Sequence, residues 1–316
     1  MLEYILFAIG FVFLIKGADY LVDGASLIAE RLGISQLMIG LTIVAFGTSA
    51  PELVVAVISS LQGNSEIILG NIIGSNISNI LLILGSAALI YPVKVRYSTI
   101  WKEIPFSLLA ALLLLALVNN TSQNISLYDG LTMLFIFSLF IYYTFIENKN
   151  HAKKKKHKEL LKIEKSEFYK AIAMVGVGLV GLFLGGQWVV QGAVSLARYF
   201  GLSEFLISAT IIAIGTSLPE LAVAVSASLK KKLDLAIGNV IGSNIFNILL
   251  VLGISSLISP VHVPVFINSD IIFLIYMTVL LLVLVYIDKN KTLSRWEGLL
   301  FILLYIAYLI FIIIRG

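Results

Sequence analysis

The sequence predicts an all-α integral membrane protein of ten transmembrane helices, arranged as two inverted five-helix repeats. Three observations lead to this prediction. Hydrophobic residues make up 59% of the 316 positions and charged residues only 13%, whereas soluble domains contain about 25% charged residues. The apolar segments run to about 20 residues, the length of a helix that crosses a bilayer. A polar motif in the first half also recurs in the second half.

The repeated motif is Gly-Thr-Ser-x-Pro-Glu-Leu, which begins at Gly47 and again at Gly215, 168 residues later. The same offset aligns Gly-Asn-x-Ile-Gly-Ser-Asn-Ile-x-Asn at Gly70 with its copy at Gly238. Across the aligned stretches, 38 of 76 positions are identical without a gap. Apolar helices can match in Leu, Ile and Val by composition alone, but matched Thr, Pro, Glu and Asn at fixed positions indicate a duplication.

Each predicted element follows from this repeat and from the apolar segments. The first helix lacks a basic region before it and is expected to be retained, the second helix carries the first motif, and the third carries the second motif. Two further apolar helices complete the first repeat, residues 1–146. A lysine-rich linker at 147–167 separates it from the second repeat, 168–316. The predicted helices are 3–30, 36–61, 67–91, 101–118, 127–146, 168–198, 204–229, 235–258, 268–287 and 295–314.

The positive-inside rule places the linker in the cytoplasm. With ten crossings both termini then lie outside, 19 lysines and arginines fall on the linker side, and only Arg198 and Arg315 fall on the other, with Lys16 inside the membrane. Because five helices separate corresponding residues, the second repeat enters the bilayer from the opposite face. Inverted repeats with interrupted helices are typical of secondary transporters. We expect a multi-pass protein of the cell membrane that functions as a monomer.

Glu52 and Glu220 are the acids of the repeated motif and lie near the middle of predicted helices. An uncompensated acid there costs about 2.5–3.5 kcal/mol on insertion scales, so each needs a partner. The predicted partner is a cation, because Lys16 is on another helix; a protonated glutamate is the alternative.

Asp19 and Asp23 in the first helix align with glutamines in the second repeat. We therefore expect them to pair near Lys16, or to face water at an unwound helix end, rather than to bind transported ions.

The first motif also supplies neutral oxygens. Pro51 and Pro219 have no N–H, so the carbonyls of Gly47 and Gly215 lose their helical donors. Hard cations such as calcium bind carboxylate, carbonyl and hydroxyl oxygens, and no His or Cys lies nearby to favour a softer metal. The hydroxyls within one turn of the acids are those of Thr48, Ser49, Thr216 and Ser217.

The second motif places Ser75 and Asn79, and likewise Ser243 and Asn247, four residues apart on one helix face. These side chains are predicted to complete a cage of oxygens, although Ser and Asn can also simply join helices. The motif glycines and those that follow are predicted to allow close helix packing: Gly70, Gly74, Gly85, Gly238, Gly242 and Gly253.

These motifs and the ten-helix layout resemble the cation/calcium exchanger superfamily, in its prokaryotic sodium/calcium exchanger branch. The resemblance implies that Ca²⁺ is exported in exchange for Na⁺ by alternating access, while the first and sixth helices slide over a fixed core. It also implies these cation ligands: Glu52, Glu220, Thr48, Thr216, Ser49, Ser217, Ser75, Ser243, Asn79, Asn247 and the carbonyls of Ala45 and Ala213.

One departure leaves the coupling ion open. Some members of the superfamily have Asp where this chain has Asn247, so their site holds a third acid. Exchange of Ca²⁺ for H⁺, or exchange that depends on K⁺, is the alternative within the transporter class. A channel and an intramembrane metal-dependent enzyme are more distant alternatives. No cofactor and no nucleic-acid partner is expected.

Overall fold

The computed structural model describes residues 2–120, 124–155, 165–201, 213–264 and 266–315, and almost all of its elements are helices. The first half contains α1 (Leu2–Leu32), α2 (Gln36–Ile39), η1 (Gly40–Val44), α3 (Ala45–Thr48), α4 (Ala50–Leu61), α5 (Ser65–Ser78), η2 (Asn79–Ile83), α6 (Leu84–Ile90), β1 (Val93–Lys94), α7 (Tyr97–Trp101), α8 (Glu103–Val118), β2 (Asn124–Ile125) and α9 (Leu127–Lys155). The second half contains α10 (Lys165–Tyr199), α12 (Ala213–Gly215), α13 (Leu218–Leu229), α14 (Leu233–Ile245), η4 (Phe246–Val251), α15 (Leu252–Ile258), β3 (Val261–His262), α16 (Ile267–Ile287), β4 (Thr292–Leu293) and α17 (Arg295–Arg315).

Within the described residues, eight helices are long and apolar enough to cross a membrane. A further candidate span is Gln36–Thr48 joined to Ala50–Leu61, which is bent by 45° at the break. The all-α membrane fold predicted from the sequence is thus confirmed. Of the predicted helix 204–229, residues 204–212 lie outside the described residues, and α12 and α13 represent the rest.

The ends of the predicted linker are helical. Helix α9 continues past residue 146 to Lys155, and α10 begins at Lys165, before the predicted start at 168. Lysine and glutamate favour helix and neither Pro nor Gly interrupts these stretches, so charge alone does not end the helices. Residues 156–164 of the linker lie outside the described residues.

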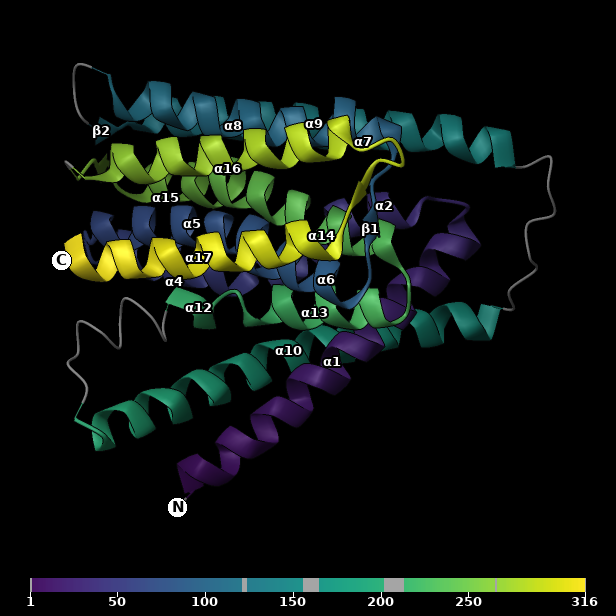
Figure 1. Cartoon of the computed structure of the whole chain (residues 1–316), viewed down its shortest axis with the longest axis horizontal. Helices are drawn as coiled ribbons and strands as arrows, with labels where there is room; N and C mark the ends of the chain where they lie inside the picture. Colours follow the sequence, from purple (N-terminus) through teal and green to yellow (C-terminus); the bar gives the residue numbers. More distant parts are fainter. Residues whose placement is uncertain (1, 121–123, 156–164, 202–212, 265, 316) are drawn as a thin grey trace.

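The two halves share one architecture and run in opposite directions. Adding 168 to the residue numbers of α4 gives the bounds of α13, and adding 168 to the first residue of α9 gives the first residue of α17. Figure 1 shows that α9 and α17 begin at opposite ends of the bundle and run in opposite senses. Short antiparallel ladders join the halves: β1 pairs with β4 and β2 pairs with β3.

Helices α5 and α14, with the π-helical turns η2 and η4 that follow them, form the centre of the bundle and supply many of its fully buried side chains. Close packing needs glycine here, since a Cβ on Gly238 would lie 2.5 Å from the Leu37 carbonyl oxygen. A Cβ on Gly242 or Gly85 would also lie within 3 Å of a backbone carbonyl oxygen, and one on Gly253 would lie 3.0 Å from the Leu134 side chain, so these glycines allow close packing as predicted. Gly70 and Gly74 are different, because no described residue lies within 4 Å of a Cβ built on either.

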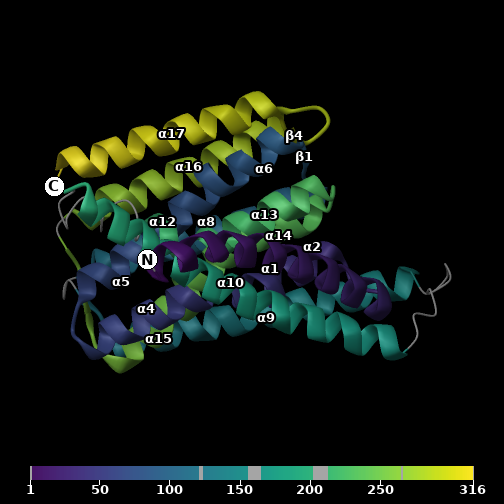
Figure 2. The same cartoon turned by 90° about the horizontal axis from the view of Figure 1, so that it is seen from below.

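Helices α1 and α10 form a second layer and lie side by side along one face of the bundle (Figures 1 and 2). Their backbones approach closely through glycines: a Cβ on Gly17 would lie 2.9 Å from the carbonyl oxygen of Gly178. Small residues at such a contact allow two membrane helices to pack without interlocking long side chains.

Candidate cation site

Glu52 and Glu220 occupy the first turns of α4 and α13, directly after the break in each repeated helix. Each break comes just before a proline, as the sequence predicts, because Pro51 and Pro219 can begin a helix but cannot continue one. Both glutamate side chains are 0% exposed, and the hydroxyl of Ser49, three residues before Glu52, contacts the Glu220 carboxylate. The fold thus brings two acids together in its interior.

Hydroxyls from both repeats contact these carboxylates. Ser49 Oγ donates to Oε1 of Glu220 at 3.1 Å, so a residue of the first motif binds the acid of the second. Ser243 Oγ donates to the same oxygen at 3.5 Å, and Ser75 Oγ donates to Glu52 Oε1 at 3.3 Å. The second oxygen of each carboxylate has no hydrogen-bond partner among the described residues.

The two threonines of the repeated motif make equivalent contacts. Thr48 Oγ1 donates to Oδ1 of Asn239 at 3.0 Å and lies 3.5 Å from Ser243 Oγ. Thr216 Oγ1 donates to Oδ1 of Asn71 at 3.2 Å and lies 3.5 Å from Ser75 Oγ. Asn71 and Asn239 are one repeat apart and were not among the predicted site residues. Their identity in both copies of the second motif is the signal that could have found them.

Asn79 and Asn247 present free amide oxygens. Their amide nitrogens donate to Asn244 Oδ1 at 2.9 Å and to Asn76 Oδ1 at 3.1 Å, respectively. Five buried oxygens of predicted site residues have no hydrogen-bond partner among the described residues: Glu52 Oε2, Glu220 Oε2, Ser217 Oγ, Asn79 Oδ1 and Asn247 Oδ1. We call these five atoms the oxygen cage. Buried polar atoms are normally satisfied, and a bound cation is one partner that acceptors of this kind can share.

The alanine carbonyls are placed differently. The carbonyl oxygen of Ala45 accepts the Ser49 N–H at 2.9 Å and lies 3.3 Å from Thr48 Oγ1. In the second repeat the Ser217 N–H bonds to the carbonyl of Ile214. Ala213 begins α12, directly after the undescribed stretch.

Within the described residues, no group of three or more His, Cys, Asp or Glu side chains could hold a metal ion. The side chains gathered around the two glutamates offer carboxylate, hydroxyl and amide oxygens. That donor set suits hard cations.

Asp19 and Asp23 do not pair near Lys16, and α1 is continuous around them. Lys230 Nζ lies 3.1 Å from Asp19 and 2.8 Å from Asp23, and Lys232 Nζ lies 3.1 Å from Asp23. The prediction of their partner was wrong because the sequence does not show that α1 packs on the end of α13. These ion pairs join the α1–α10 layer to the bundle.

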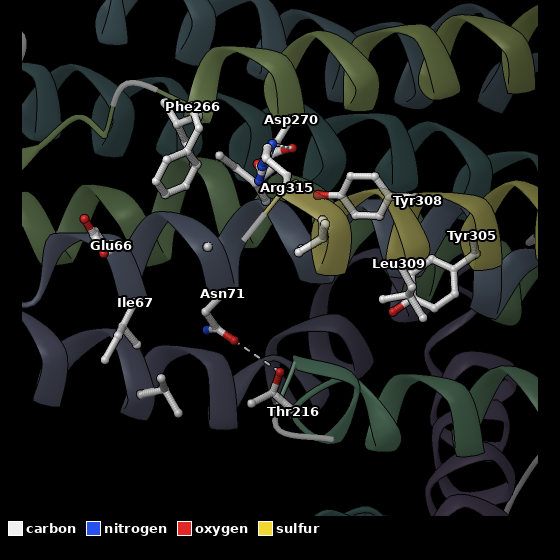
Figure 3. Close-up of a pocket in the computed structure, with 16 residues that line it drawn as sticks. Glu66, Ile67, Asn71, Thr216, Phe266, Asp270, Tyr305, Tyr308, Leu309 and Arg315 are labelled. Atoms are coloured by element: carbon white, nitrogen blue, oxygen red, sulfur yellow. Dashed lines mark hydrogen bonds and ion pairs between the residues drawn. The ribbon is translucent and has the colours of Figure 1, made fainter. Parts of the chain in front are cut away.

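A cavity of about 340 Å³ lies beside the site. Figure 3 shows Asn71 and Thr216 on its wall, joined by their hydrogen bond, with the ion pair of Asp270 and Arg315 across the cavity from them. The hydroxyl of Thr216 lies 3.5 Å from Ser75, which contacts Glu52. The hydroxyls of Thr216 and Ser75 therefore connect the cavity wall to the Glu52 carboxylate.

An all-α membrane protein with two inverted repeats and an acid from each repeat buried at its centre has the architecture of a membrane cation transporter. Comparison with known proteins identifies the family. The sequence model described as sodium/calcium exchanger protein matches residues 2–146 and 170–314. This chain belongs to the sodium/calcium exchanger family, and it is a cation/calcium antiporter rather than an enzyme.

Relatives cover nearly the whole chain. The putative antiporter CaxA of Alkalimonas amylolytica is 40% identical over 95% of each chain. The sodium/calcium exchanger MaX1 of Methanosarcina acetivorans is 33% identical over 98% of this chain and 97% of its own. The solved structure of the sodium-calcium exchanger NCX_Mj soaked with Na⁺ and Sr²⁺ has a TM-score of 0.84 at 31% identity and covers 97% of each chain.

Proposed function

We propose that this protein exports Ca²⁺ in exchange for Na⁺ by alternating access, and that both ions bind in the oxygen cage. The observation that supports the proposal most directly is the set of five buried acceptors without partners. A cation can be coordinated by carboxylate, hydroxyl and amide oxygens alike, whereas a proton on each glutamate would add only two donors for the three remaining oxygens.

The charge of the site fits one divalent ion. Two carboxylates contribute at most two negative charges, and among the described residues neither forms an ion pair with a basic side chain. One Ca²⁺ balances them, and two Na⁺ carry the same charge. An acid at position 247 would add a third negative charge, so Asn247 bears on how many sodium ions the site accepts.

The relatives support exchange between sodium and calcium. MaX1 is named a sodium/calcium exchanger, and the NCX_Mj structures are described in terms of extracellular ion exchange and induced occlusion of the binding site. The α1–α10 layer packs on the bundle as a unit, in keeping with sliding of these two helices over a fixed core. The cavity beside Thr216 approaches one side of the cage, with Ser75 between Thr216 and Glu52.

We further propose that the linker at 147–167 lies on the cytoplasmic side, that both termini lie outside the cell, and that the monomer is the functional unit. The excess of lysines and arginines on the linker side supports this orientation.

Ion fluxes in proteoliposomes test the proposal. Vesicles loaded with NaCl, with KCl or with a pH gradient alone are diluted into calcium, and calcium uptake is followed. Sodium-loaded vesicles should take up calcium, and potassium or protons alone should not support it. Uptake driven by a proton gradient without sodium would favour the Ca²⁺/H⁺ alternative, and uptake that needs both sodium and potassium would favour the K⁺-dependent alternative.

A further inference from the structure

Four buried asparagines lie where the two central helices cross. Asn76 and Asn79 belong to the first copy of the second motif, and Asn244 and Asn247 belong to the second copy. All four side chains are at most 1% exposed. Asn79 and Asn247 supply amide oxygens to the oxygen cage, whereas Asn76 and Asn244 contribute no atom to it.

Asn76 and Asn244 bind each other's backbone. Asn76 Nδ2 donates to the carbonyl oxygen of Asn244 at 3.2 Å, and Asn244 Nδ2 donates to the carbonyl oxygen of Asn76 at 3.3 Å. A backbone carbonyl can only accept a hydrogen bond, so the nitrogen of each amide must face it. The orientation of both amides is therefore fixed, and each Oδ1 faces the other way.

The fixed oxygens in turn orient the two cage residues. Asn244 Oδ1 accepts from Asn79 Nδ2 at 2.9 Å, and Asn76 Oδ1 accepts from Asn247 Nδ2 at 3.1 Å. Each cage amide thus has its nitrogen held and its oxygen left free. The contacts cross between repeats, since Asn244 of the second repeat holds Asn79 of the first.

We propose that Asn76 and Asn244 are positioning residues, which turn the amide oxygens of Asn247 and Asn79 toward the bound cation. This inference rests on the proposed function of the cage. Without Asn244, the Asn79 amide is free to rotate and present its N–H₂ group, which repels a cation. An asparagine pair that only joined helices would stabilise the fold but would not affect one cage residue selectively.

Two double-mutant cycles test the proposal. Calcium binding to purified protein is measured for the parent, Asn244→Ala, Asn79→Ala and the double variant, and then for the same set with Asn247→Ala in place of Asn79→Ala. Asn244→Ala should weaken calcium binding by about tenfold, as expected for loss of one well-placed hydrogen bond. When Asn79 is already alanine, Asn244→Ala should weaken calcium binding little further. When Asn247 is alanine instead, the losses of calcium affinity from the two substitutions should multiply.

The mirror cycles use Asn76, which should couple to Asn247 and not to Asn79. Thermal unfolding in detergent is measured for every variant. If the losses of calcium affinity multiply in both cycles, the positioning role is overturned. A loss of thermal stability with unchanged calcium affinity would overturn it as well. If Asn244→Ala does not fold, Asn244→Ser and the Asn76 cycles provide the same test. If none of these variants folds, the asparagines are determinants of the fold and the proposal fails. A folded parent that binds no calcium would instead refute the proposed function itself.

Discussion

At the scale of single residues, the candidate site depends on buried oxygen atoms that accept no hydrogen bond from the described residues. Each cage glutamate uses one oxygen for hydroxyl contacts and leaves the other unpartnered in the interior. A glutamine has the same shape, but it lacks the charge and replaces an acceptor with a donor. The carboxylates should therefore be the least replaceable groups in the chain.

We expect Glu52→Gln and Glu220→Gln each to abolish calcium exchange in proteoliposomes while the protein remains folded, because half of the negative charge is lost. Glu167→Gln, at an exposed position at the start of α10, is the matched control and should transport normally. Near-normal exchange by a folded Glu220→Gln variant would remove that residue from the site.

The substitution Asn247→Asp tests how the negative charge of the site affects transport. In Asn247→Asp, three acids share one cage, and the new side chain has no N–H to donate to Asn76 Oδ1. The variant should hold a proton when few cations are bound, so its transport should depend on pH more steeply than that of the parent between about pH 6 and 8. Coincident pH profiles at matched calcium and sodium would mean that residue 247 does not face the ions.

At the scale of helices, the two copies of one motif pack differently. Gly238 lies against the backbone of α2 and η1, but no described residue crowds its counterpart Gly70, which lines the cavity. We expect Gly238→Ala to destabilise the protein by about 1–3 kcal/mol, because the new methyl group overlaps the Leu37 carbonyl.

Gly70→Ala is the control for this comparison and should not lower the thermal unfolding temperature in detergent. Equal destabilisation of both variants would show that the two copies pack alike, against the asymmetry seen here.

The ion pairs of Asp19 and Asp23 join the α1–α10 layer to the end of α13 through partly exposed side chains. The side chains of Asp19 and Asp23 are 38% and 42% exposed, and such pairs contribute about 1 kcal/mol or less. Asp19→Asn and Asp23→Asn should each keep at least about half of the parent's exchange rate, since neither acid belongs to the cage. Complete loss of exchange in both folded variants would make these acids part of the ion path.

At the scale of the whole molecule, duplication made much of the structure predictable. Matched Pro and Glu positions predicted the helix breaks and the buried acids, because each has a local cause in the backbone or in desolvation. The partners of Asp19 and Asp23 and the open surroundings of Gly70 depend on which helices meet, and no local pattern encodes that. The role of Asn76 and Asn244 lies between these cases: their repetition was visible, but their crossed hydrogen bonds required the fold.

Calcium binding to the purified protein, with sodium as competitor, tests the central claim most directly. We expect each chain to bind one calcium ion, rising sodium to displace it, and Glu220→Gln to remove the binding. Calcium that stays bound at saturating sodium, or binding that survives in Glu220→Gln, would contradict a single cage shared by the two ions.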